Sequence, residues 1–257
     1  MRRKRKDAAL VGAEGYKVVL HTITKIIACQ VVIEELLPLL PEGVDYETLD
    51  LGLHVNPDKL RSTLQEKIDA STKETGTILL GYGLCSRAVV GLRSEKCSLV
   101  VPCVDDCIGI FLGSREAYLK QAKAEPGTYY LTKGWIEAGD SLFGDHNQMI
   151  ERYGPEQAEV LIKRMLQNYT RLVFINTGKY RVEHYREYSE RTASRYGLRF
   201  QEISGARTLV DKMVNGPWDK DFVVVSPGQT ISYEAFYKSA GWTPSIITDA
   251  LGNVEQE

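Results

Sequence analysis

The sequence predicts an α/β protein of two similar βαβ lobes, each built on a parallel sheet. Short apolar runs such as 77–80 and 98–101, bounded by Gly or Pro, are typical of buried central strands. Segments with helical periodicity, such as 58–71, separate these runs. Strands that alternate with helices of this length indicate βαβ units, and therefore parallel strands.

The same alternation of strand and helix patterns continues along the chain. The expected strands are 25–28, 46–51, 77–80, 98–101, 128–131, 171–175, 198–203 and 222–225. The expected helices are 31–40, 58–71, 115–124, 155–169, 182–196 and 206–214. We expect a flexible basic leader at 1–22, an N-terminal lobe with the cysteine loops at 23–135, and a C-terminal lobe at 136–257. The binding site is then expected at the carboxyl ends of the strands, between the lobes.

Composition narrows the class of protein. The 257 residues are 43% hydrophobic and 26% charged, and the formal net charge is −2. This balance gives no reason to expect nucleic acid or an anionic membrane as a partner. No apolar run approaches the ~18 residues of a membrane span. Polar residues interrupt the segment after the basic N-terminus, so we expect no signal peptide and a cytoplasmic protein with reduced cysteines.

Three of the five cysteines follow predicted strands. Cys29 ends the strand 25–28, Cys85 follows 77–80, and Cys107 follows 98–101. Because the carboxyl ends of neighbouring parallel strands meet at one edge, we expect the three sulfurs close enough together to share a metal. Three thiolates with one open position suit catalytic zinc, or a 4Fe-4S cluster with one unligated iron. The alternative is that they are buried small hydrophobes, which describes Cys97 best.

Several neighbours of these cysteines are candidate site residues. His54 ends another strand and suits a ligand, a base or a substrate contact, or a local backbone hydrogen bond. Asp106, beside Cys107, could orient a ligand or hold a substrate ammonium; capping is the alternative. Tyr82, between two glycines, and Trp135, after a strand, are candidate substrate contacts, although core packing is common for such aromatics. Asn176 could contribute a polar group from the facing lobe.

Five strings occurring in order carry a family resemblance: ACQVVIEEL, LGLHVNPDKLR, ILLGYGLC, VVPCVDDCIGIFLGSREAY and PGTYYLTKGWIE. Together they resemble the uncharacterised prokaryotic family called domain of unknown function 1638. Members of that family are often encoded beside corrinoid-dependent methyltransferases, which implies a role in one-carbon metabolism. The family pattern carries over to Cys29, His54, Cys85, Asp106 and Cys107. It departs at Asp105, where His is commoner, and at Cys103, where a basic residue is commoner, so the fourth metal ligand or a base is expected to differ.

The expectation is therefore a thiolate-metal enzyme or accessory protein of corrinoid-linked methyl transfer, with zinc on Cys29, Cys85 and Cys107. A metal-dependent methyltransferase acting on a small molecule, with a corrinoid protein as partner, is one form of this. An iron–sulfur enzyme on the same cysteines is the first alternative. A metal-free module that binds a small ligand or a corrinoid protein is the second.

Overall fold

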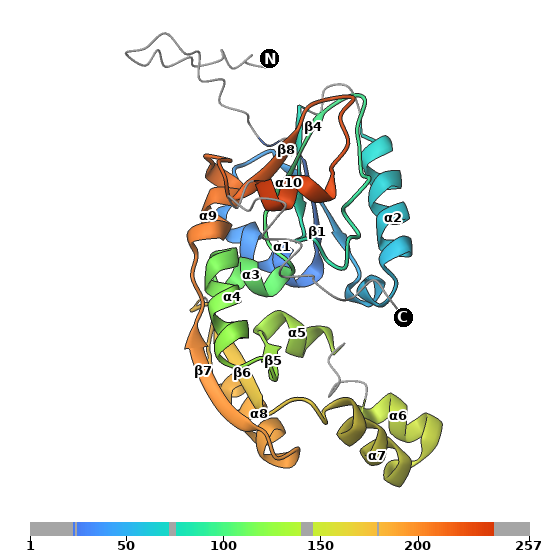
Figure 1. The fold of residues 1–257 in the computed structure, drawn as a ribbon, viewed down its shortest axis with the longest axis vertical. Helices are drawn as coiled ribbons and strands as arrows, with labels where there is room; N and C mark the ends of the chain where they lie inside the picture. Colours follow the sequence, from blue (N-terminus) through green and yellow to red (C-terminus); the bar gives the residue numbers. More distant parts are fainter. Residues whose placement is uncertain (1–22, 24, 72–75, 140–145, 179, 239–257) are drawn as a thin grey trace.

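The described residues form two sheets with helices packed around and between them (Figure 1). The computed structural model describes residues 23, 25–71, 76–139, 146–178 and 180–238. The predicted leader, 1–22, lies outside the described residues. The chain is an α/β protein, as the alternation of patterns predicts.

The first sheet has five strands in the order β2-β1-β3-β4-β8. The strands β1 to β4 are parallel, whereas β8 runs antiparallel to β4. Every residue of β1 and β3 is buried, which explains their uninterrupted apolar runs. The strands are β1 (Lys25–Cys29), β2 (Asp45–Leu49), β3 (Thr77–Gly81), β4 (Ser98–Pro102) and β8 (Phe222–Val225).

Capping side chains and prolines determine where the helices around the first sheet begin and end. Helix α2 (Pro57–Asp69) starts after Asn56, whose side chain accepts a hydrogen bond from the Lys59 amide at 3.0 Å. Helix α1 (Gln30–Leu36) is shorter than predicted because Pro38 lacks an amide proton, and a 3₁₀ turn (Leu37–Leu39) follows it. A second 3₁₀ helix, η2, and two α-helices complete the set: η2 (Leu51–Val55), α9 (Thr208–Asn215) and α10 (Tyr233–Lys238).

The second sheet has three parallel strands in the order β5-β6-β7. A small core of Leu131, Ile162, Leu166, Leu172, Ala193 and Leu198 lies between this sheet and its helices. The strands are β5 (Thr128–Leu131), β6 (Arg171–Asn176) and β7 (Arg199–Ser204), and the helices are α6 (His146–Tyr153), α7 (Pro155–Met165) and α8 (Glu183–Arg195).

Three short helices lie between the two sheets (Figure 1): α3 (Cys107–Phe111), α4 (Arg115–Ala124) and α5 (Lys133–Ala138). Helix α5 packs directly against α1, where Gly134 allows close approach to Val31. The main core extends across this layer, since it includes Val173 and Ile175 of β6. The two sheets therefore share a continuous apolar interior.

Two strands pair with partners that the sequence alone does not indicate. Strand β5, expected in the N-terminal lobe, pairs with β6 in the second sheet. Strand β8, expected in the C-terminal lobe, returns to the first sheet and runs antiparallel to β4. The apolar pattern of a strand reports that it is buried, but it carries no information on which neighbour it pairs with or in which direction.

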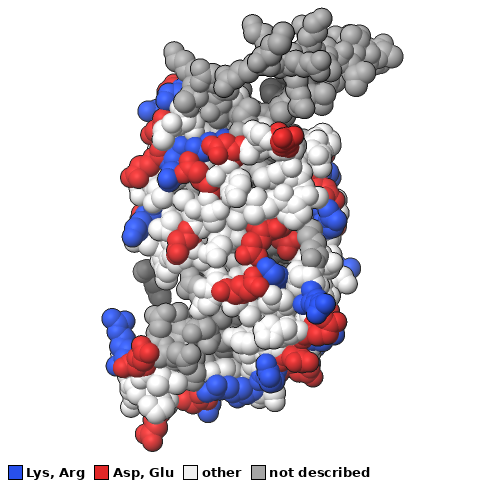
Figure 2. Space-filling model, turned by 180° about the vertical axis from the view of Figure 1, so that it is seen from behind, with Lys and Arg blue, Asp and Glu red and all other residues white. Residues whose placement is uncertain are grey.

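The surface carries charges of both signs. On the face seen in Figure 2, acidic and basic side chains are interspersed over the described residues. None of the helices in the described ranges has the length and apolar character needed to cross a bilayer.

Candidate functional site

Cys29, Cys85 and Cys107 come to the same edge of the first sheet. Cys29 is the last residue of β1, Cys85 lies four residues beyond β3, and Cys107 opens α3 after β4. Because β1, β3 and β4 are parallel neighbours, these ends meet at one edge, as the sequence predicts. All three side chains are buried, and none is in a disulfide.

Two backbone hydrogen bonds hold the loops that carry Cys85 and Cys107 side by side. The Leu84 amide donates to the Val104 carbonyl at 2.8 Å, and the Cys85 amide donates to the Asp105 carbonyl at 2.9 Å. The approach is so close that a Cβ on Gly83 would lie 2.8 Å from the Val104 oxygen. Glycine is therefore needed at this position for steric reasons.

The Cys85 loop is conformationally strained. Cys85, Ser86 and Arg87 are consecutive non-glycine residues with positive φ, at 45°, 55° and 69°. Such residues cost about 1–3 kcal/mol each and persist only where the surroundings hold them. Here Arg61 of α2 donates to the Arg87 carbonyl at 2.9 Å, and the Arg87 guanidinium lies 4.6 Å from the ring centre of Tyr233.

The thiols are close enough to influence one another's protonation. Burial raises the pKa of the Cys85 thiol to about 12, and the Asp106 carboxylate and Cys29 add to the effect. Burial also raises the pKa of Cys107, together with Asp106, Cys29 and Cys85, while the Trp135 indole acts in the opposite direction. Cys85 and Cys107 are therefore neutral thiols near pH 7.

The thiols do not form a finished metal site as they stand. Within the described residues, no group of three or more His, Cys, Asp or Glu side chains is arranged so that it could hold a metal ion. The expected convergence of sulfurs on one point is thus not seen in this structure. For the three thiols to coordinate one metal ion, their side chains would have to move.

Within the described residues, the side chain of Tyr82 brings a buried, unpaired hydroxyl close to these thiols. The residue is 1% exposed, and its hydroxyl oxygen is buried with no hydrogen-bond partner in the described structure. Burial, with smaller contributions from Cys29 and Cys85, raises the pKa of Tyr82 well above its usual value. Since leaving a buried hydroxyl unpaired costs about 1–3 kcal/mol, this atom is a feature that a bound group would explain.

His54 packs on Tyr82 from the 3₁₀ helix η2. The two rings are stacked, with centroids 5.9 Å apart and planes 29° apart. The His54 Nδ1 atom lies 2.9 Å from the Leu51 carbonyl oxygen, so this nitrogen carries a proton. In the neutral ring Nε2 then holds the lone pair, which is the form that accepts a proton or ligates a metal.

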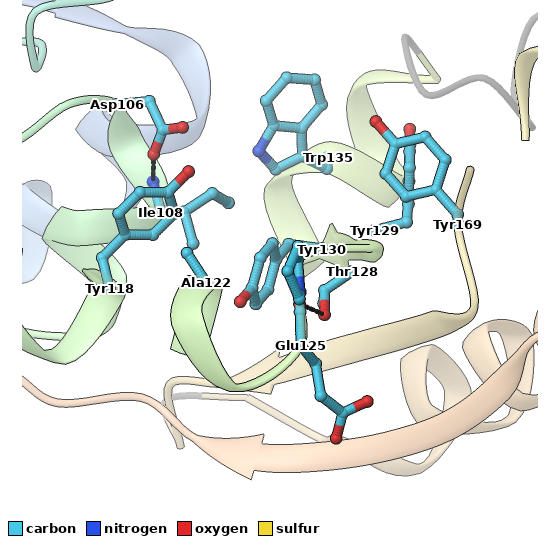
Figure 3. Close-up of a pocket in the computed structure, with 11 residues that line it drawn as sticks. Asp106, Ile108, Tyr118, Ala122, Glu125, Thr128, Tyr129, Tyr130, Trp135 and Tyr169 are labelled. Atoms are coloured by element: carbon cyan, nitrogen blue, oxygen red, sulfur yellow. Dashed lines mark hydrogen bonds between the residues drawn. The ribbon is translucent and has the colours of Figure 1, made fainter. Parts of the chain in front are cut away.

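A pocket of about 270 Å³ lies next to Cys107, between the two sheets (Figure 3). Two predicted site residues, Asp106 and Trp135, line it. Asp106 also caps α3, since its carboxylate accepts a hydrogen bond from the Ile108 amide at 2.9 Å. The remaining lining residues are Ile108, Tyr118, Ala122, Glu125, Pro126, Thr128, Tyr129, Tyr130 and Tyr169.

Other candidates are engaged elsewhere. The Asn176 amide donates to Glu202 at 2.8 Å, and its oxygen accepts from the Gly178 amide, so Asn176 serves its own sheet and does not line the pocket. Cys103 donates to the Phe236 carbonyl at 2.9 Å. Asp105 is held by Arg115 at 2.9 and 3.1 Å. Cys97 precedes β4, at the opposite edge, with its sulfur 3.0 Å from the Ser94 hydroxyl.

Sequence reasoning missed the tyrosines of the pocket. The Tyr129–Tyr130 pair was the available signal, but side-chain alternation along a strand would place at most one of them on a given face. Tyr118 reaches the pocket from α4 and Tyr169 from the turn before β6, and neither position has a local pattern of its own. The pocket depends on how the second sheet is docked.

The fold and site define an α/β protein with cysteine-bearing loops at the carboxyl edge of a parallel sheet. The chain belongs to the family described as Protein of unknown function (DUF1638), whose model matches residues 48–214. That match includes His54, Cys85 and Cys107 but begins after Cys29. No curated protein and no solved structure shows significant similarity to the chain.

Proposed function

We propose that this protein is a thiolate-metal enzyme or accessory protein of corrinoid-linked methyl transfer, with zinc held by Cys29, Cys85 and Cys107. The observation that carries the proposal is the meeting of three buried cysteines at one sheet edge, beside the unpartnered Tyr82 hydroxyl. The link to corrinoid chemistry rests on the gene neighbourhood that the family resemblance implies.

The donor set fits a thiophilic metal. Three thiols match zinc's preference for sulfur, and a fourth position would stay open for a substrate or water. Bound zinc would lower the pKa of a coordinated heteroatom and make it a better nucleophile. Metal binding would require the thiols to lose protons, and the raised pKa values of Cys85 and Cys107 oppose this in the metal-free state.

The surrounding residues would support such a centre in distinct ways. The Tyr82 hydroxyl, next to Cys29 and Cys85, would donate a hydrogen bond to a thiolate or to a coordinated group. His54 would keep Tyr82 in place by ring stacking and present Nε2 as a proton acceptor. Asp106 and Trp135 would face the substrate from the adjoining pocket.

Two alternatives use the same residues differently. A 4Fe-4S cluster could occupy the three cysteines, with the fourth iron open to substrate. A metal-free binding module is favoured by a specific observation, since no three candidate ligands in the described residues are arranged for a metal while a pocket is present. In that case the cysteines would act as small buried hydrophobes.

Metal analysis of anaerobically purified protein separates the three functions. About one zinc per chain in colourless protein supports the proposal. Brown protein with iron and stoichiometric sulfide supports the cluster. Protein that takes up neither metal on reconstitution, although folded, supports the binding module.

Two cysteine variants make this test specific. Cys85→Ser should strip the metal, because serine is a poor zinc ligand at neutral pH. Cys97→Ser is the matched control, a buried cysteine at the opposite edge, and should keep its metal. Equal metal loss from both variants would contradict the assignment of ligands.

A further inference from the structure

The pocket beside Cys107 has an unusual lining. Five of its eleven lining residues are aromatic, two are carboxylates, and none is Lys, Arg or His. In Figure 3 the Asp106 carboxylate lies at one end, with the Tyr118 hydroxyl and the Trp135 indole to either side of the space beside it. Acidic groups among aromatic rings discourage an anionic ligand and favour a cationic one.

The two carboxylates differ in how their charge is balanced. Glu125 pairs with Arg199 and lies 3.4 Å from the Arg171 guanidinium. Asp106 accepts hydrogen bonds from neutral groups, namely the Ile108 and Gly109 amides and the Tyr118 hydroxyl, and no described Lys, Arg or His forms an ion pair with it. Arg115, at the start of α4, pairs with Asp105 at 2.9 Å. Within the described part of the chain, the half-buried Asp106 carboxylate of this pocket thus has no cationic partner.

The aromatic rings present several faces and edges along the pocket, and Tyr118 and Tyr130 are close enough to interact with the Asp106 charge (Figure 3). Tyr118 and Tyr130 have ring centroids 6.5 Å apart at 46°. Tyr129 and Tyr169 form an edge-to-face pair at 5.5 Å and 76°. Trp135, whose indole gives the strongest cation–π attraction among side chains, stands over the same space (Figure 3).

The chemistry of the walls also selects among cations. A primary ammonium group has three N–H donors, which the carboxylates, the tyrosine hydroxyls and Thr128 could accept, so the selection depends on the five rings that face the cation. Alkyl groups on nitrogen would remove those donors and spread the charge over C–H groups that contact the rings. The volume of about 270 Å³ lies just below the roughly 300–1,000 Å³ typical of pockets for drug-sized ligands, so the ligand is small.

We propose that this pocket binds a small alkylated ammonium ion, with Asp106 as its counter-ion and Trp135 with the tyrosines as its cation–π walls. The inference deepens the proposed function, because it names the substrate class for the site that the cysteines adjoin. The binding step itself depends on the pocket and not on the presence of metal.

Choline and 3,3-dimethyl-1-butanol provide the test, because they share shape and hydroxyl but only choline is charged. Titration calorimetry on the full chain should show choline binding at least about tenfold tighter than the alcohol, about 1.4 kcal/mol. Tetramethylammonium should compete with choline. Equal binding of choline and the alcohol, or no binding of either cation to folded protein at about 10 mM, would overturn the proposal.

Matched variants assign the binding to this pocket. Asp106→Asn keeps a residue that caps helices well and should weaken choline binding about tenfold. Trp135→Leu should weaken it by a similar factor, whereas Tyr153→Leu, an exposed tyrosine outside the pocket, should not change it. Unchanged affinity in both pocket variants, with folding verified by circular dichroism, would refute the assignment.

The same measurements separate this inference from the metal proposal. Cys85→Ser protein should lose its metal and still bind choline, and Asp106→Asn protein should keep its metal while binding choline weakly. A protein that binds choline but never takes up metal would leave the inference intact and reject the thiolate-metal function. The reverse result would reject only the inference.

Discussion

Arg171, buried in the second sheet, and Tyr82, buried at the edge of the first, differ in whether their polar atoms have hydrogen-bond partners. In the second sheet, Arg171 is 3% exposed and donates to Thr128, Gln201 and Gln121, and Asn176 donates to Glu202. At the carboxyl edge of the first sheet, the Tyr82 hydroxyl is buried without a hydrogen bond, and neighbouring backbone has positive φ.

This difference distinguishes residues that stabilise the fold from residues that remain available to bind a ligand. A strand end whose polar atoms are satisfied internally is stable but has nothing left to offer a ligand. An edge with a strained loop and an unpaired hydroxyl costs stability and is the kind of place where ligands bind. The second sheet contributes Tyr129 and Tyr130 to the pocket that Asp106 and Ile108, the neighbours of Cys107, also line.

The largest expected effect comes from the supporting sheet. Arg171→Met keeps much of the side-chain volume but leaves Glu125 without one partner and removes the donor to Thr128, Gln201 and Gln121. We expect a loss of about 3–5 kcal/mol in the free energy of unfolding, measured with urea. Arg207→Met, which removes an exposed ion pair with Asp211, is the control and should cost about 0–1 kcal/mol. Similar losses in both would show that the Arg171 network does not hold this sheet.

The cysteine edge should be sensitive to the close approach of its loops. Gly83→Ala places a methyl group against the Val104 carbonyl and the Asp106 backbone, so we expect a loss of about 1–3 kcal/mol and of the site's metal or ligand binding. Gly43→Ala is the control, because Gly43 has φ of +88° but open space around it and suffers only backbone strain. Full binding by folded Gly83→Ala protein would contradict the importance of the loop pairing.

An alkaline pH should destabilise the metal-free protein through its thiols. Since the folded pKa of Cys85 is raised to about 12, the unfolded chain loses this proton first, near about 8.5. The stability contributed by the protonated thiol is complete below the unfolded pKa and is lost as the pH rises through the folded value. The midpoint of unfolding should therefore decrease as the pH is raised from about 8.5 to 10. In Cys85→Ala protein the midpoint should depend less steeply on pH. If the midpoint of Cys85→Ala protein depended on pH as steeply as that of the parent, the Cys85 thiol would have to lie in a more polar environment than the structure indicates.

The smallest expected effect concerns Asp106. Burial raises its pKa, although hydrogen bonds from the Ile108 and Gly109 amides act against this. Stability from the protonated form is present below the unfolded pKa of about 3.9 and is lost as the pH rises through the folded pKa. Asp106→Asn should thus be more stable than the parent at pH 7, by roughly 1 kcal/mol, with the difference vanishing in acid. A less stable variant at pH 7 would mean that the negative charge is already balanced.

The sequence by itself determined the local elements and the edge at which the cysteines gather. Apolar runs predict β1, β3 and β4, and the rule that parallel strands end together then brings Cys29, Cys85 and Cys107 to one side. The start of α2 at Asn56-Pro57 could also be predicted from the sequence, because a helix cap is made by residues within one turn.

Only the tertiary structure decided which surfaces meet. The return of β8 to β4, the place of β5 beside β6, and the use of Asn176 within its own sheet all depend on partners far away in the chain. The same holds for the pocket, which Tyr118, Tyr130 and Trp135 reach from three different elements. Periodicity records how strongly each residue is buried, whereas the identity of its neighbour is fixed by packing of the whole chain.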